Sequence, residues 1–345
     1  MRKFAFIIFV DTIEALKRMH GLYRALPFFA VEAILKNKPA IQIFHARNIT
    51  CGRGEKIDGH IILCPLFPNK YMGGLHMDFV MDRINSAGNL AKKLGADIVG
   101  FDTLPQAVSD KEQAISDLLK IPITTGRALT AWSMFEAAYR ITKAKRIPFA
   151  QTVITVLGAN KPLAQLCAFK CSSLGARLVV FDWNQEKLVA SKERLLKFLS
   201  TANKPEALTL FAKDNLALAV AEADIIINAD NFDEGRFLNN TKRSATVLDL
   251  FGCDAKPLNR TSANNVNFIK AGLIKMPHLT RLGFHTGLPE GVICSGLAET
   301  MLLTYEGKFV NYSIGDNINP DDLEEIADMA AAHGFEVWLP EAPVI

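Results

Sequence analysis

Short apolar runs alternate with amphipathic stretches along the first third of the chain. The apolar runs predict strands, which are KFAFIIFV (3–10), HIILCPL (60–66) and ADIVGF (96–101). Apolar residues recur at helical spacing in four other stretches, at 12–20, 78–94, 107–119 and 128–143. Strands that alternate with helices are typical of α/β layer structures, so we expect an α/β fold.

The alternation becomes regular after residue 150. Strands are predicted at 152–158, 176–182, 208–212, 224–229, 245–250 and 265–272, with helices at 162–174 and 185–199. This order of elements predicts a doubly wound parallel sheet of the Rossmann type. Two further helices follow at 295–307 and 321–333, and Gly334 ends the second one before the strand FEVWL.

These patterns predict three parts. Residues 1–127 form an N-terminal α/β domain on the substrate side, and residues 128–284 form a Rossmann-type domain that resembles dinucleotide-binding domains. Residues 285–345 form a C-terminal helical segment that packs back on the N-terminal domain. The composition indicates a globular chain with two cores, because 49% of the 345 residues are hydrophobic and 22% are charged.

The charge distribution argues against a nucleic-acid partner. The 39 basic and 36 acidic residues leave a net charge of +3, and no run of five or more basic residues occurs. The N-terminal apolar run has only the length of a strand and is followed at once by Asp11 and Glu14. We therefore expect neither a signal peptide nor an integral membrane span, and we expect a cytoplasmic protein.

Cysteines and histidines predict no metal site. The six cysteines lack the spacing of a metal knuckle or a disulfide scaffold. Buried free thiols of this kind are typical of proteins in a reducing compartment. Cys167 and Cys171 are four residues apart on a predicted helix, and core packing explains that spacing. His45, His60 and His76 lack partners at ligand spacing.

Residues 153–166, VITVLGANKPLAQL, carry the candidate phosphate loop. Gly158 can make the tight turn after the strand, but the two later glycines of a dinucleotide loop are absent. Pro162 suits the first helical position, and free N–H groups there, with the cation of Lys161, could attract a pyrophosphate. Lys161 also extends a long side chain into the space that the second glycine leaves open. A turn that binds nothing is the alternative.

Asp182 ends the next strand, 24 residues after Gly158 (182 − 158). An acid at this place bonds the adenosine ribose of NAD and repels the 2′-phosphate of NADP, so NAD is slightly favoured if a dinucleotide binds. The alternative is an acid that caps the next helix near Asn184. The predicted cofactor-binding set is Gly158, Ala159, Asn160, Lys161, Asp182 and Ala229.

Several phrases resemble the long-chain fatty acyl-ACP reductases of cyanobacterial alkane formation and their bacterial shikimate/quinate-dehydrogenase-like relatives. They run in order from about residue 60 to 338 and are CPL (64–66), AKKLGADIVGF (91–101), ITTG (123–126), ADIIINA (223–229), AETMLLTYEGKFVNYSIG (298–315) and AAAHGFEV (330–337). The resemblance implies a central NADPH-binding Rossmann domain. It also implies a cysteine near the C-terminal helix that takes a fatty acyl group from a thioester, followed by reduction to a fatty aldehyde.

The chain departs from that family at each active element. The family's G-A-T-G-x-I-G loop is GANKPLA (158–164) here, and an Ala-Arg pair suited to NADP is replaced by Asp182 and Trp183. A Gly-Phe-Thr-Ser loop becomes DTLPQ (102–106). The position of the nucleophilic cysteine is Gly296, which cannot carry an acyl group.

Cys294, two residues upstream, is the candidate replacement. If Gly296 is the N-cap of the helix and Glu299 its third residue, Cys294 lies in the extended lead-in and its thiol points to the same side. If the helix begins earlier, the thiol faces away, and a buried structural cysteine is the alternative. His285, on the loop before Cys294, is the candidate acid or base, with a bystander role as its alternative.

Three functions are compatible with these residues. The first is an NAD(P)H-dependent oxidoreductase of the acyl-thioester lineage, acting on acyl-ACP or acyl-CoA with altered chemistry. The second is a pseudoenzyme that binds an acyl group or a protein partner and needs no nucleotide. The third is a dehydrogenase of a small alcohol or hydroxy acid, which needs no thiol. Chain length of the acyl group, physiological partner and homo-oligomer formation stay open.

Overall fold

The computed structural model describes residues 1–10, 17, 21–37, 40–66, 76–201, 208–212, 215–230, 232–250, 258–262, 264–277, 288–315 and 319–340. The chain divides into two compact units. Unit 1 comprises Met1–Arg127, Ile274–Asp316 and Ile326–Glu336. Unit 2 comprises Ala128–Leu273, Asn317–Glu325 and Val337–Ile345.

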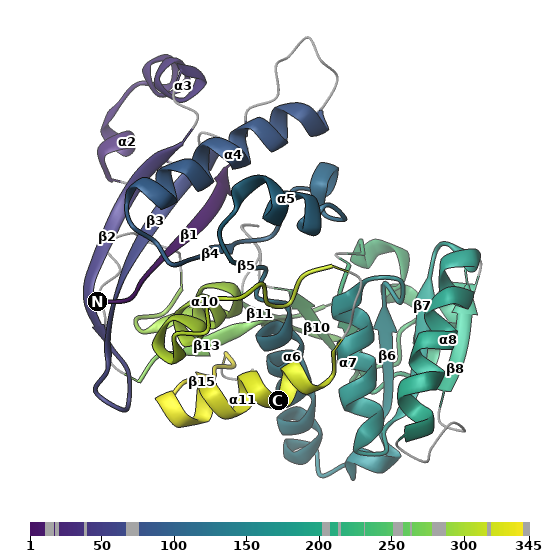
Figure 1. The fold of residues 1–345 in the computed structure, drawn as a ribbon. Coiled ribbons are helices and arrows are strands. Elements are labelled where there is room, and N and C mark those ends of the chain that lie inside the picture. The colour runs from purple at the N-terminus through teal and green to yellow at the C-terminus, as the bar shows by residue number, and fades with distance from the viewer. Residues whose placement is uncertain are drawn as a thin grey trace. The chain divides into compact units, whose positions relative to one another are not determined.

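Unit 1 contains a five-stranded sheet in the order β2-β3-β1-β4-β5 (Figure 1). The strands are β1 Lys3–Val10, β2 Ile41–Thr50, β3 Lys56–Pro65, β4 Ile98–Phe101 and β5 Ile123–Thr124. Strands β3, β1, β4 and β5 are parallel, and β2 pairs antiparallel with β3 at the edge. The carboxyl ends of the four parallel strands therefore lie along one edge of the sheet.

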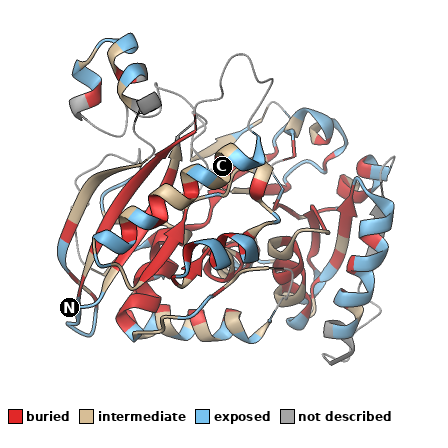
Figure 2. Ribbon diagram, turned by 45° about the horizontal axis from the view of Figure 1, so that its top comes forward, coloured by how far each residue is buried: buried red, intermediate tan, exposed pale blue. Residues whose placement is uncertain are grey.

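Helices cover both faces of this sheet. The helices of unit 1 are α2 Gly21–Ala25, α3 Phe28–Asn37, α4 Met77–Lys93, α5 Glu112–Leu119 and α10 Ser295–Glu306, and α11 Asp321–His333 ends in it. The apolar side of α4, with Val80 and Ile84, packs on Ile7 of β1. On the opposite face, α10 approaches β4 so closely that a Cβ at Gly100 would overlap the Thr300 hydroxyl. Figure 2 shows the resulting buried strands.

Unit 2 contains a seven-stranded sheet in the order β11-β12-β10-β9-β6-β7-β8. Its strands are β6 Val153–Leu157, β7 Arg177–Asp182, β8 Leu208–Ala212, β9 Ile225–Asn228, β10 Thr246–Leu250, β11 Asn259–Thr261 and β12 Asn267–Ala271. All neighbours are parallel except β11, which pairs antiparallel with β12. Numbered along the chain, the parallel strands follow the 3-2-1-4-5-6 order of a doubly wound sheet, which confirms the predicted fold class.

Helices also cover both faces of the second sheet. They are α6 Arg127–Ala144, α7 Pro162–Ser173, α8 Gln185–Thr201 and α9 Leu216–Ala221. Burial on both faces explains why β9 reads as a continuous apolar run rather than an alternating one. Cys167 and Cys171 of α7 lie in the core, and burial raises the pKa of Cys171 to about 12, so both behave as packing residues.

The remaining elements are short. The 3-10 helices are η1 Gln106–Val108, η2 Phe149–Gln151, η5 Glu234–Arg236 and η6 Leu238–Asn240. Strands β13 Leu273–Lys275, β14 Val292–Cys294 and β15 Glu336–Val337 form a third sheet in the order β14-β13-β15. Among the described residues, no helix combines the length and the apolar character that crossing a membrane requires.

Two regions differ from the pattern seen in the sequence. Strand β2 was not predicted, because most of its residues are only half-buried and its pairing with β3 contains two irregularities, which removes the regular alternation. The stretch 107–119 forms η1 and then α5 instead of one helix. The predicted helix at 12–20 lies outside the described residues except for residue 17.

Replacing Gly126 by alanine should destabilise unit 1 more than a φ penalty alone explains. Gly126 has φ +74°, and its Cβ would overlap Cα of Gly296 and lie 3.0 Å from the Gly296 nitrogen. We expect Gly126→Ala to lower the free energy of unfolding by about 3 kcal/mol, measured by chemical denaturation. Gly315→Ala is the matched control, since Gly315 has φ +72° and open space around it, and it should cost about 1 kcal/mol. Equal losses in both variants would disprove the close packing.

His60 should make unit 1 sensitive to acid. Burial, with help from His45 and Lys3, lowers the pKa of His60 from 6.5 to about 4, and its Nε2 has no hydrogen-bond partner among the described residues. The unfolded chain therefore takes up this proton first, so stability is complete above about pH 6.5 and falls as the pH drops toward 4. We expect wild type to lose about 3 kcal/mol more than His60→Gln over this range. The control His76→Gln should keep the wild-type profile, and a profile unchanged in His60→Gln would refute the assignment.

Candidate functional site

The turn after β6 in unit 2 has already used its backbone donors. Gly158 and Ala159 both donate their N–H groups to the carbonyl of Phe181, at 2.9 and 3.1 Å. The N–H of Asn160 donates to Oδ2 of Asp182 at 2.9 Å, and that of Lys161 donates to the Gly158 carbonyl at 2.8 Å. A diphosphate that entered this turn would find these four N–H groups occupied.

Asp182 connects this turn to the start of α8. Its side chain is 4% exposed, and its Oδ1 accepts the N–H of Asn184 at 2.9 Å while Oδ2 accepts that of Asn160. Asn184 in turn caps α8, because its Oδ1 accepts the N–H of Lys187 at 2.9 Å. The carboxylate thus bonds two backbone segments of its own unit and is shielded from a ribose.

Asp230 fills the space beside Gly158. With φ +90° the glycine turns the chain, and a Cβ on it would lie 2.6 Å from Cβ of Asp230. Nζ of Lys161 lies 3.7 Å from Oδ1 of Asp230. Burial raises the pKa of Asp230, and the nearby Lys161 opposes that shift. The open side of the turn therefore holds an acidic side chain and the cation paired with it.

The turn as it stands does not fit a dinucleotide diphosphate. The N–H groups of Gly158 to Lys161 are satisfied, and the ligand's charge has the same sign as the carboxylates of Asp182 and Asp230. One buried acceptor, Oδ1 of Asn160, lacks a partner among the described residues, but an acceptor attracts a hydroxyl rather than a phosphate oxygen. Ala229, at the end of β9, is buried and offers no polar side chain. We therefore derive no reaction step through a nicotinamide here.

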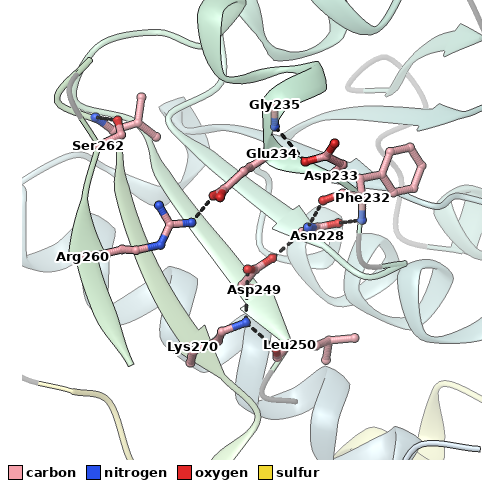
Figure 3. Close-up of polar contacts among 11 residues, drawn as sticks. Asn228, Phe232, Asp233, Glu234, Gly235, Asp249, Leu250, Arg260, Ser262 and Lys270 are labelled. Carbon is pink, nitrogen blue, oxygen red and sulfur yellow. Dashed lines mark hydrogen bonds and ion pairs between the residues drawn. The ribbon is translucent and has the colours of Figure 1, made fainter. Parts of the chain in front are cut away.

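A buried polar chain crosses the other half of this sheet edge (Figure 3). Asn228, Asp249 and Lys270 stand in register on β9, β10 and β12. Nδ2 of Asn228 donates to Asp249 at 2.7 Å, and Nζ of Lys270 donates to the other carboxylate oxygen at 3.3 Å. Asn228 also bonds the N–H and the carbonyl of Phe232, so it ties Phe232 to the end of β9. In the sequence, this network is visible only as one charged residue in each of two apolar strands, Asp249 in VLDL and Lys270 in FIKA. The strands were predicted from their apolar residues, so the network was not.

Cys294 lies at the start of α10 in unit 1. It is the last residue of β14 and the N-cap of α10, with φ −70° and ψ 150°, and it is partly exposed. The thiol residue therefore precedes the positive end of a 12-residue helix, where a thiolate is stabilised. His285, the other predicted catalytic residue, lies outside the described residues.

The capping arrangement expected around Gly296 is not formed. Helix α10 begins at Ser295, earlier than that arrangement requires, so Gly296 is its second residue and Glu299 its fifth. Cys294 is itself the N-cap with an extended backbone, so it lies outside the helix and the rotation between helical residues two apart does not apply to its thiol. Glu299 is fully buried, and its carboxylate accepts a hydrogen bond from the Thr124 hydroxyl. The first turn of α10 is closely packed here, since a Cβ on Gly126 would overlap Cα of Gly296.

Asp102 is a further candidate in the same region. It follows β4, and its N–H donates to the carbonyl of Ile7 at 3.0 Å. Burial raises the pKa of Asp102. The carbonyl of the preceding residue lies 3.1 Å from the position of a Cβ on Gly296, which puts Asp102 beside the first turn of α10. An acid whose pKa is raised and that lies near the start of α10 is a candidate for proton transfer there. Asp102 begins DTLPQ, where the chain departs from the acyl-ACP reductases, and no pattern in the sequence marked this acid as a site residue.

Two known proteins are similar to this chain in sequence. "Aminotransferase PigE" of Serratia sp. is 20% identical over 341 residues, which are 96% of this chain and 38% of that protein. "Long-chain acyl-[acyl-carrier-protein] reductase" of Synechococcus elongatus is 22% identical over 312 residues, which are 86% of this chain and 87% of that protein. The chain thus spans well under half of PigE. No protein-family profile matches the chain.

Solved dehydrogenase structures resemble the chain distantly. Quinate dehydrogenase from Corynebacterium glutamicum in complex with NAD has 13% identity and a TM-score of 0.33, over 71% of this chain and 78% of that one. L-tryptophan dehydrogenase from Nostoc punctiforme has 10% identity and a TM-score of 0.36, over 77% of this chain and 64% of that one. Likenesses of this size do not transfer a function. The chain's sequence is similar to the acyl carrier protein reductase at a distant level, and its second sheet has the doubly wound order.

Proposed function

We propose that this chain is an oxidoreductase-like protein of the acyl-thioester reductase lineage, in which Cys294 takes an acyl group from a thioester and the reduction step is altered. The observation that carries the proposal is the position of Cys294, partly exposed at the N-cap of α10 in the segment of similarity to the reductase. Acyl-ACP and acyl-CoA are the donors, because both present the acyl group as a thioester.

The acyl transfer needs only groups of this chain and the donor. The Cys294 thiolate, stabilised by the helix start, attacks the thioester carbonyl carbon and forms a new C–S bond. The bond to the carrier sulfur breaks, and the carrier leaves as a thiolate that takes up a proton. Solvent can supply that proton, and Asp102, whose pKa burial raises, is the candidate to relay it. No oxidant or reductant enters this step.

The nucleotide turn supports a changed second step. In the parent reaction the acyl group is reduced to an aldehyde by NADPH, but the turn of unit 2 holds its own acids where the diphosphate belongs. The negative charge of Asp182 also repels the 2′-phosphate of NADP, so NAD would be repelled less than NADP. The same observation favours a second candidate function, a pseudoenzyme that binds an acyl group as a regulatory partner and binds no nucleotide.

Incubation with a long-chain acyl-CoA should acylate one thiol of the protein. Intact-mass spectrometry should show one added acyl group in wild type and in the control Cys64→Ala, whose buried thiol has a pKa raised to about 12. Cys294→Ser should show none, and serine preserves the N-cap of α10. An adduct that persists in Cys294→Ser would refute the assignment. Acyl-CoA binding by calorimetry without any adduct would support the pseudoenzyme instead.

Removing the acid beside Gly158 should open the turn to nucleotide. We expect Asp230→Asn to bind NADH and NADPH about tenfold more tightly than wild type, because a like-charge pair at 4 Å repels by about 4 kcal/mol at an effective dielectric of 20 and partial exposure screens much of it. The change also releases Lys161 for the diphosphate. Calorimetric titration measures both affinities. Glu222→Gln, which removes the same charge at the opposite end of β9, should change neither, and an equal effect in both variants would exclude the local explanation.

A further inference from the structure

Three ligand atoms of different chemistry converge in unit 1. Nδ1 of His333 lies 3.1 Å from Sγ of Cys51 and 3.4 Å from Oε2 of Glu55, and these sulfur and oxygen atoms are 3.7 Å apart. Cys51 and Glu55 flank the turn between β2 and β3, and His333 is the last residue of α11. Residues 51 and 333 are 282 positions apart in the chain, so only the fold brings them together.

The three separations match the edges of a tetrahedral zinc site. Bonds of about 2.3 Å to sulfur and about 2.0–2.2 Å to nitrogen and oxygen place tetrahedral ligand atoms about 3.3–3.6 Å apart. The observed separations of 3.1, 3.4 and 3.7 Å scatter around this range. A cation between the three atoms needs only small movements of the side chains.

The backbone on both sides of the cluster is fixed. The N–H of Gly52 donates to the His333 carbonyl at 2.8 Å, and a Cβ on Gly52 would lie 2.8 Å from that oxygen. The N–H of Cys51 donates to the Glu55 carbonyl at 3.2 Å, which closes the turn and holds both ligands on it. The turn and the end of α11 therefore meet backbone to backbone, with no room for a side chain on Gly52.

The imidazole is oriented as a metal ligand. Nε2 of His333 lies 2.6 Å from Oε1 of Glu306, so Nε2–H donates to this carboxylate and the Nδ1 lone pair is directed at Cys51 and Glu55. The Tyr305 ring stacks on the imidazole with centroids 5.1 Å apart, and the Tyr305 hydroxyl donates to the Ile49 carbonyl at 3.1 Å. A carboxylate behind a histidine and a fixed ring are the outer contacts that metal-binding histidines have.

Burial distinguishes a metal site from a catalytic thiol. Cys51 and His333 are both 0% exposed, so a substrate carbonyl cannot reach the thiol. The Glu55 side chain is 48% exposed, so a cation can enter along it and keep one water ligand there. Thiolate and imidazole ligands favour zinc over magnesium or calcium.

We propose that Cys51, Glu55 and His333 bind one zinc ion, with water as the fourth ligand. Binding releases the Cys51 thiol proton to solution, so one thiolate and one carboxylate balance the two charges of the ion while the imidazole stays neutral. The ion joins the β2–β3 turn to the end of α11, and so stabilises unit 1. This site is independent of the acyl transfer proposed for Cys294.

Cobalt titration of the full chain, after removal of bound metal by a chelator, tests the proposal. Wild type should bind one Co²⁺ per chain, with the strong visible bands of a tetrahedral site and a sulfur-to-cobalt charge-transfer band, and Zn²⁺ should displace it. Cys51→Ser should lose the charge-transfer band and weaken binding by about 100-fold or more, and Glu306→Gln should weaken it by about 10–100-fold. The controls Cys64→Ala and His60→Gln, from the neighbouring strand, should bind as wild type does.

Glu55→Gln keeps the test decisive if a buried variant fails to fold, because this side chain is half-exposed. It should bind Co²⁺ at least about tenfold more weakly while its circular dichroism spectrum and its metal-free unfolding midpoint stay unchanged. Zinc should raise the unfolding midpoint of wild type and do so far less in Glu55→Gln. The proposal is overturned if wild type binds no stoichiometric Co²⁺, if the spectrum lacks the sulfur band, or if Cys51→Ser and Glu55→Gln bind as wild type does.

Discussion

The backbone N–H groups of the turn after β6 bond to acceptors within unit 2, and what this unit can bind depends on that arrangement. A diphosphate is held in such turns chiefly by free N–H groups at the start of a helix. Here the groups from Gly158 to Lys161 bond to Phe181, Asp182 and Gly158 itself. Each exchanged bond brings a net gain of only about 1 kcal/mol or less, so a ligand gains little by replacing bonds of equal quality.

Charge adds to this constraint. Replacing an internal acceptor by a phosphate would also leave the Asp182 carboxylate buried with one partner fewer, and uncompensated buried charge is costly. Asp230 occupies the remaining space beside Gly158, where a second negative charge opposes the ligand. The absent glycines of the loop are therefore only part of the difference from a dinucleotide-binding turn. The side chains of Asp182 and Asp230, which bond to the turn and fill the space beside it, are another part.

Close backbone packing also constrains the start of α10. Gly126 and Gly296 touch through their backbones, and the carbonyl of Phe101 lies 3.1 Å from the place of a Cβ on Gly296. A cysteine at position 296 would have to move these neighbours by a few tenths of an ångström, whereas position 294 lies before the first turn and is partly exposed. Position 294 can therefore hold a thiol at the positive end of this helix without disturbing that packing.

The sequence predicted elements whose pattern is local and missed those set by distant contacts. The apolar runs of β6, β7 and β9 are recognisable because a covered parallel sheet buries nearly every residue of its strands. Strand β2 has no such pattern, since its register is interrupted twice. The position of Asp182 at the end of β7 was predictable, but its bond to Asn160 was not, because it depends on how two turns meet.

The candidate metal ligands show the same limit most clearly. Cys51 and Glu55 are separated from His333 by most of the chain, so no spacing rule relates them. Some other buried polar groups also pair between separate elements, as Glu299 does with Thr124, and Lys270 with Asp249. Such pairs add little net stability over apolar packing, yet removal of one partner leaves a buried charge or dipole unpaired. These pairs therefore act mainly on the specificity of the fold, because a shifted register of α10 or β12 would separate the partners. The hydrogen bond between Glu306 and His333 fixes the position of the imidazole in the same way.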